Sequence, residues 1–125
     1  MIHFTPEEFW CKCGREACEA PRTVHTTLLD RLEVVRGEYG RPLSITSGLR
    51  CAYHNAQVGG VSSSGHLTGY EADVACVQSG DRYALLNAAF RVFPRIGIGK
   101  SFLHLGCDPA LPQRVVWHYY PPLHE

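Results

Sequence analysis

The chain has 125 residues, with twelve basic and twelve acidic side chains and no net formal charge. This balance, with no run of like charge, excludes the electrostatic footprint of a nucleic-acid or anionic-membrane binder and fits a neutral or small zwitterionic ligand. The length predicts one domain, residues 1–125. Since the chain lacks a signal-peptide pattern and a long apolar run, we expect it to be cytoplasmic as synthesised, with no membrane insertion.

The N-terminal segment begins with a helix signal. Thr5, Pro6 and Glu8 form a capping-box pattern, in which the threonine hydroxyl and the glutamate carboxylate satisfy each other's backbone amides. The sequence therefore predicts a short helix from this point.

Three cysteines, Cys11, Cys13 and Cys18, follow this helix. Their C-x-C-x4-C spacing lacks the C-x2-C pair of common zinc ribbons and supplies only three ligands. Free thiols in a reducing compartment, a structural metal, and a disulfide that also draws on Cys51 all remain open.

The regular elements predict an α+β fold. Residues 26–39 carry a 3.6-residue apolar stripe closed by Gly40, and residues 81–93 carry a second one. Strands are expected at 43–47, 71–76, 96–99, 102–105 and 114–119. Because no strand-helix-strand unit repeats, we expect a small, mostly antiparallel sheet with helices packed on one side.

A candidate metal site lies at the centre of the chain. His66 and Asp73 are separated by six residues, among them Gly69, which allows a loop to turn back into a strand. A catalytic zinc takes three protein ligands from imidazole, carboxylate or thiolate groups. We predict His104 as the third, because strand alternation places it with Phe102 on one face of its strand.

The central motifs resemble a known family, the zinc D-alanyl-D-alanine peptidases, which include phage endolysins and share a fold with the hedgehog signalling domain. The resemblance spans residues 3–119 and is closest to the small phage and prophage branch. It is carried by SGLR at 47–50, by residues 51–55, by VGG at 58–60, by SGHLTGYEADV at 64–74 and by FLH at 102–104.

The resemblance implies a Zn²⁺ peptidase that cuts peptidoglycan stem peptides, as a D-Ala-D-Ala carboxypeptidase or an endolysin-type endopeptidase. It implies a zinc held by His66, Asp73 and His104, which activates water for amide hydrolysis. Arg50 would bind a substrate carbonyl or carboxylate. Ser64 is the other predicted substrate-binding residue, in a small-residue loop that suits either peptide approach or a mobile lid.

The general base is the open position. Residues 100–103 lack the acidic residue or histidine that relatives place before the third ligand, and Gly106 replaces the Asp of many small relatives. We predict Asp108 first and His118 second. Glu71 is an alternative base, or a hydrogen-bonding partner of a ligand, because it shares a strand face with Asp73.

Two other functions are compatible with these residues. One is a zinc-holding but catalytically silent wall-binding or virion module, and the other is a metal-free structural domain whose histidines belong to the core. Under the leading hypothesis the protein is a monomer whose partner is a peptidoglycan stem peptide, and it reaches the cell wall after phage-assisted release.

Overall fold

The computed structural model describes residues 3–15, 18, 20, 21, 23–58, 66 and 68–120. Within them lie one 3₁₀ helix, three α-helices and five strands, in the order η1 (Pro6–Phe9), α1 (Thr26–Tyr39), β1 (Ile45–Ser47), α2 (Ala52–Gln57), β2 (Glu71–Ala75), α3 (Ser79–Phe90), β3 (Arg95–Ile98), β4 (Phe102–Gly106) and β5 (Val115–His118). None of the helices in these residues is long and apolar enough to span a bilayer.

The strands form one mixed sheet in the order β1-β2-β4-β3-β5. The β1–β2, β2–β4 and β4–β3 pairs are antiparallel, and only β3–β5 is parallel. The predicted α+β class with a mostly antiparallel sheet is therefore confirmed. The parallel pair places β5 at the sheet edge beside β3, so that β4 and β3 both lie between it and β2.

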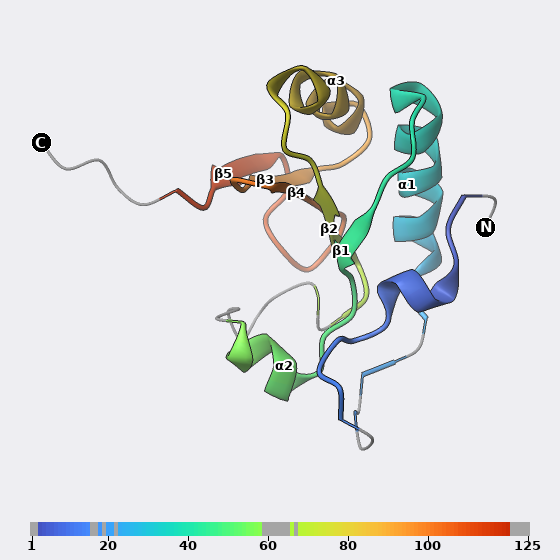
Figure 1. Ribbon diagram of the computed structural model, residues 1–125, viewed down its shortest axis with the longest axis vertical. Coiled ribbons are helices and arrows are strands. Elements are labelled where there is room, and N and C mark those ends of the chain that lie inside the picture. The colour runs from blue at the N-terminus through green and yellow to red at the C-terminus, as the bar shows by residue number, and fades with distance from the viewer. Residues whose placement is uncertain are drawn as a thin grey trace, which may run out of the picture.

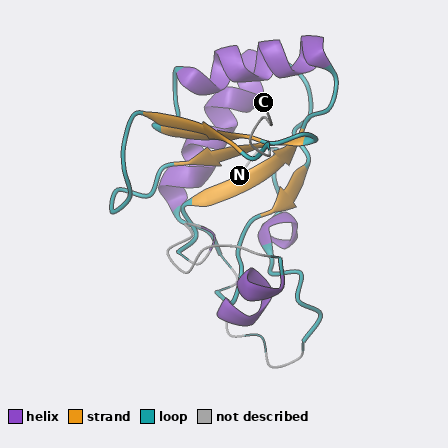
Figure 2. Cartoon of the chain, turned by 90° about the vertical axis from the view of Figure 1, so that its left-hand side faces the viewer, coloured by secondary structure: helices purple, strands orange, loops and turns teal. Residues whose placement is uncertain are grey.

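The two long helices cover one face of the sheet. Figure 1 shows α1 and α3 next to each other on one side of the strands, with α2 apart from both, and Figure 2 shows the same arrangement from the side. The core lies between these layers and contains Leu28, Leu32 and Val35 of α1, Leu85, Ala88 and Ala89 of α3, and Ala72, Val74, Ile96, Leu103 and Leu105 of the sheet.

The ends of the helices follow from local chemistry. The α1 helix occupies the predicted residues 26–39 and ends at Gly40, whose φ of 77° is easily reached only by glycine. The α3 helix ends at Phe90, earlier than the predicted residue 93, and the amides of Val92 and Phe93 instead bond the Ala89 carbonyl in a turn. Since the residue before a proline avoids helical geometry, this turn prepares the chain for Pro94.

The N-terminal segment is fixed to the loop after β1. The predicted capping box at Thr5 is present, with the Thr5 amide donating to Glu8 Oε2 at 2.6 Å. The Leu49 amide donates to the Phe9 carbonyl at 2.8 Å, and a Cβ added at Gly48 would lie 2.8 Å from the Phe9 Cα. Glycine at residue 48 therefore permits a close backbone crossing between the N-terminal segment and the loop after β1.

Candidate metal centre

Three side chains meet on the face of the sheet opposite the helices. Asp73 of β2 pairs directly with His104 of β4, so both side chains project from the same face, while Val74 and Leu103 point into the core. His66 comes from the segment before β2. One ligand atom from each of His66, Asp73 and His104 lies within 4.8 Å of the others, and all three residues are buried.

The His66 ring is oriented by the backbone. Its Nδ1 lies 2.7 Å from the Gly48 carbonyl oxygen, which can only accept a hydrogen bond, so Nδ1 carries the proton. Its Nε2 is then unprotonated in the neutral ring and lies 3.5 Å from Asp73 Oδ2. This is the tautomer that a metal-binding histidine requires.

The His104 ring is oriented by a carboxylate. Its Nε2 lies 2.5 Å from Glu71 Oε1, and its Nδ1 lies 2.9 Å from Asp73 Oδ1. Glu71 Oε2 accepts from the Arg95 guanidinium at 2.8 Å, which fixes the carboxylate in turn. Glu71 thus contacts the edge of the ring that faces away from Asp73. This geometry suits a partner that holds the ring of a ligand, the second of the two roles considered for Glu71.

The space for the Glu71 side chain is provided by Gly106. The two residues are paired across β2 and β4, and a Cβ added at Gly106 would lie 2.4 Å from Glu71 Cδ. The resemblance described above leads us to expect an aspartate at position 106. In this chain the neighbouring strand brings a carboxylate over the same position.

The charges of the centre stabilise one another. Burial alone would raise the pKa of Asp73, but the hydrogen bond from His104 holds it below its usual range. Burial alone would lower the pKa of His104, but its hydrogen bonds to Asp73 and Glu71 raise it above its usual value. Because a metal binds only the neutral ring, this raised pKa makes metal binding compete with protonation of His104.

Arg50 lies beside this centre and is held by three side chains. Its guanidinium donates to Ser47 Oγ at 3.0 Å, to Asn55 Oδ1 at 3.3 Å and to Asp73 Oδ2 at 3.3 Å. Its side chain is 13% exposed, and its amide donates to the His66 carbonyl at 2.9 Å. A planar, largely buried guanidinium next to a metal-binding carboxylate can bind an oxyanion or a carboxylate of a ligand.

The other predicted site residues lie elsewhere. Asp108 accepts hydrogen bonds from the Thr68 hydroxyl and the Ala110 amide, both at 2.9 Å. These contacts fix the segment that follows His66. They give no support to Asp108 as the general base, which stays a prediction. Ser64 lies outside the described residues.

His118 points away from the centre. On β5 it follows Trp117, which pairs with Gly97 and packs against the His104 ring at a centroid distance of 5.3 Å. Because side chains alternate along a strand, His118 projects from the opposite face of the sheet. There its Nδ1 accepts from the Tyr120 amide at 3.2 Å. The structure therefore does not bring this second predicted base to the three candidate ligands.

The sequence did not predict the aromatic wall of the site. Trp117 and Tyr119 lie over Gly97, where an added Cβ would come within 2.8 Å of both rings. Burial raises the pKa of the Tyr119 hydroxyl. The alternation in residues 115–119 is a signal for two aromatic side chains on one face, but only the pairing of β5 with β3 shows that this face is the one that carries His104.

The donor set and its surroundings agree with a comparison to known protein families. A family model described as Peptidase M15 matches residues 2–108. The chain belongs to the peptidase M15 family. The matched region contains Arg50 and all three metal-binding candidates. Membership of the M15 family supports a metal-binding hydrolase of the metallopeptidase class. A search of the curated proteins gave no match.

Proposed function

We propose that this protein is a zinc peptidase that hydrolyses peptidoglycan stem peptides, as a D-Ala-D-Ala carboxypeptidase or an endolysin-type endopeptidase. The observation that carries the proposal is the convergence of His66 Nε2, His104 Nδ1 and the Asp73 carboxylate beside the Arg50 guanidinium. Two imidazoles and one carboxylate are a common donor set of catalytic zinc, and three ligands leave one position open. The M15 family assignment is consistent with this chemistry.

In the proposed mechanism the protein positions each participant. His66, Asp73 and His104 would hold the zinc, and the Gly48 carbonyl and Glu71 fix the orientation of the two rings. When bound, zinc would lower the pKa of a water molecule and polarise the scissile carbonyl. Arg50, anchored at Ser47 and Asn55, stabilises the negative charge that develops on the carbonyl oxygen, or binds the terminal carboxylate of the peptide.

The peptide would lie along the exposed face of the sheet. Trp117 and Tyr119 offer an apolar wall next to His104, against which small side chains such as those of alanine can pack. Ser64 is proposed to contact the peptide backbone. A chain without net charge is suited to a zwitterionic stem peptide, and we propose that it acts as a monomer on the cell wall after phage-assisted release.

The second candidate function is a zinc-holding module that binds the cell wall without cleaving it. The specific observation in its favour is that both predicted bases have partners away from the centre: Asp108 bonds Thr68 and Ala110, and His118 bonds Tyr120. Asp108 remains the first proposed base and His118 the second, and hydrolysis itself decides between the peptidase and the silent module.

The test is digestion of purified sacculi, with the products identified by mass spectrometry. The peptidase hypothesis predicts new peptide termini that disappear with a chelator and return with added zinc, and the product masses identify the cleaved bond. His104→Ala should abolish cleavage, whereas the matched control His3→Ala, at an exposed histidine that bonds Glu33, should not. Full zinc content without any new terminus would instead establish the silent module.

A further inference from the structure

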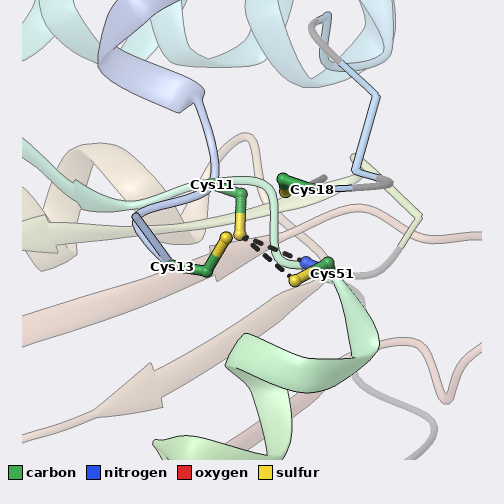
Figure 3. Close-up of side chains that lie close together, drawn as sticks. All are labelled: Cys11, Cys13, Cys18 and Cys51. Atoms are coloured by element: carbon green, nitrogen blue, oxygen red, sulfur yellow. Dashed lines mark hydrogen bonds between the residues drawn. The ribbon is translucent and has the colours of Figure 1, made fainter. Parts of the chain in front are cut away.

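Four cysteine side chains converge at a second place in the molecule. Cys11, Cys13 and Cys18 belong to the segment after η1, and Cys51 precedes α2. Figure 3 shows the four side chains gathered between these segments. All four sulfur atoms lie within 4.8 Å of one another, and none of these cysteines belongs to the His66, Asp73 and His104 centre. We call these four residues the cysteine cluster.

The spacing of one sulfur pair matches metal coordination. Cys11 Sγ and Cys51 Sγ are 3.7 Å apart. A disulfide requires about 2.05 Å between sulfurs. In contrast, a tetrahedral zinc with Zn–S distances of about 2.3 Å places its sulfurs about 3.8 Å apart. The observed distance therefore fits two thiolates of one zinc site.

Backbone amides point at three of the four sulfurs. The Cys51 amide donates to Cys11 Sγ at 3.3 Å, the His54 amide donates to Cys51 Sγ at 3.4 Å, and the Arg15 amide donates to Cys13 Sγ at 3.4 Å. A thiolate accepts such bonds more strongly than a thiol, because charge-assisted hydrogen bonds are the stronger ones. Amides donated to ligand sulfurs also orient and tune thiolate metal sites.

A left-handed glycine builds one of these contacts. Gly14 has φ of 72°, and this turn brings the Arg15 amide back over the sulfur of Cys13. A cavity of about 100 Å³ borders Cys11, Cys13 and Cys18. The backbone is thus shaped around the sulfurs, as it would be for a ligand that they share.

We propose that Cys11, Cys13, Cys18 and Cys51 bind a second zinc ion in a four-thiolate structural site. Four protein ligands fill the tetrahedral coordination of zinc and leave no position for a substrate, so this site serves folding and not hydrolysis. The local C-x-C-x4-C pattern supplies only three ligands. The fold brings in the fourth ligand, Cys51, which follows α1 and β1 in the sequence.

The proposed zinc would hold the loop that carries Arg50. Cys51 is the next residue after Arg50, and the Leu49 amide already bonds the Phe9 carbonyl of the N-terminal segment. Zinc would add a second tie between the same two segments. The Arg50 amide bonds the His66 carbonyl, so this tie would also support the segment that carries His66, although His66, Asp73 and His104 can bind their own zinc without it.

The experiment counts metal in the full-length protein purified with reducing agent. We expect two zinc ions per chain in the wild type and one in Cys18→Ala. Cys76→Ala, a matched control at a buried cysteine of the core outside the cluster, should keep two. If Cys18→Ala retains two zinc ions, the proposal is wrong. The proposal would also be overturned if the wild type bound one zinc ion per chain and His104→Ala bound none. That result would leave the proposed peptidase intact.

A spectroscopic measurement on the wild type avoids any folding defect of a cysteine variant. Exchange of zinc for Co²⁺ should give thiolate-to-cobalt charge-transfer absorption. His104→Ala should show the same absorption, because the proposed cluster does not share ligands with the other centre. Absence of this absorption overturns the proposal. The mass of the unreduced protein is a second check. A mass lower by two hydrogens for each cysteine pair, in protein that still binds one zinc, would show that the sulfurs form disulfides and would also overturn the proposal.

Discussion

The sharpest prediction concerns Glu71, whose carboxylate lies over position 106. Glu71 bonds His104 Nε2 at 2.5 Å and the Arg95 guanidinium at 2.8 Å, and its side chain is 1% exposed. Glu71→Ala removes the group that orients a proposed zinc ligand. Loss of such a partner typically costs 10–100-fold in metal affinity, which corresponds to about 1.4–2.7 kcal/mol. It also leaves Arg95, with a side chain 11% exposed, without its carboxylate.

The compensating change lies on the neighbouring strand. Gly106→Asp alone should destabilise the fold by about 1–3 kcal/mol, because its Cβ would lie 2.4 Å from Glu71 Cδ. In the double variant Glu71→Ala/Gly106→Asp that side chain is gone, and the new carboxylate can turn toward His104 from the same strand. The double variant should therefore recover most of the affinity lost in Glu71→Ala.

The assay is a zinc competition titration against a chromophoric chelator, with thermal unfolding as a second readout. Glu38→Ala, at a surface glutamate that pairs with Arg91, is the matched control and should leave affinity unchanged. Zinc binding by Glu71→Ala as tight as that of the wild type would show that Glu71 does not orient a zinc ligand. A double variant that folds but binds no better than Glu71→Ala alone would show the same.

Four further predictions concern the same centre. Arg50→Lys keeps the charge but loses the planar fork, so activity should fall about 10- to 1000-fold with zinc content unchanged, and full activity would make Arg50 a surface charge. Since its carboxylate partners raise the pKa of His104 against the effect of burial, zinc affinity measured by titration should begin to fall as pH decreases toward about 6.5. The thermal stability of the metal-free protein should fall as pH rises through the raised pKa of His104, because the protonated ring gains its carboxylate partners only in the folded state. A zinc affinity that does not change with pH would contradict the raised pKa on which both expectations depend. Asp108→Asn should lower activity at least 100-fold if Asp108 is the base, but no more than Thr68→Val does if Asp108 only fixes the loop. His118→Ala should lower activity less than the loss of a base would, because His118 lies on the opposite face of the sheet.

Sequence alone was sufficient where the signal is local. The stripe of α1 and the alternation in β2 and β4 each depend on residues close together in the chain, and they correctly placed Asp73 and His104 on the polar side of their strands. The motif from 64 to 74 supplied His66. These patterns predicted the three side chains that the structure brings together.

Features that depend on strand order could not be read in this way. Trp117 reaches His104 only because β3 lies between β4 and β5 and carries a glycine at the crossing. The sequence suggested Cys51 only as a disulfide partner of the other three cysteines, and the passage of the loop after β1 along the N-terminal segment shows that it joins their cluster. A strand pattern reveals which residues share a face but not which strand is its neighbour, so such contacts require the fold.

The most direct test of the metal centre is an anomalous difference map at the zinc edge from a crystal of the zinc-loaded protein. The structure predicts a peak bonded to His66 Nε2, to His104 Nδ1 and to the Asp73 carboxylate, at about 2.0–2.2 Å from each. Glu71 should remain on His104 Nε2. A crystal of protein that contains zinc but shows no peak between these three side chains, or a peak bonded to His104 Nε2, would contradict the account.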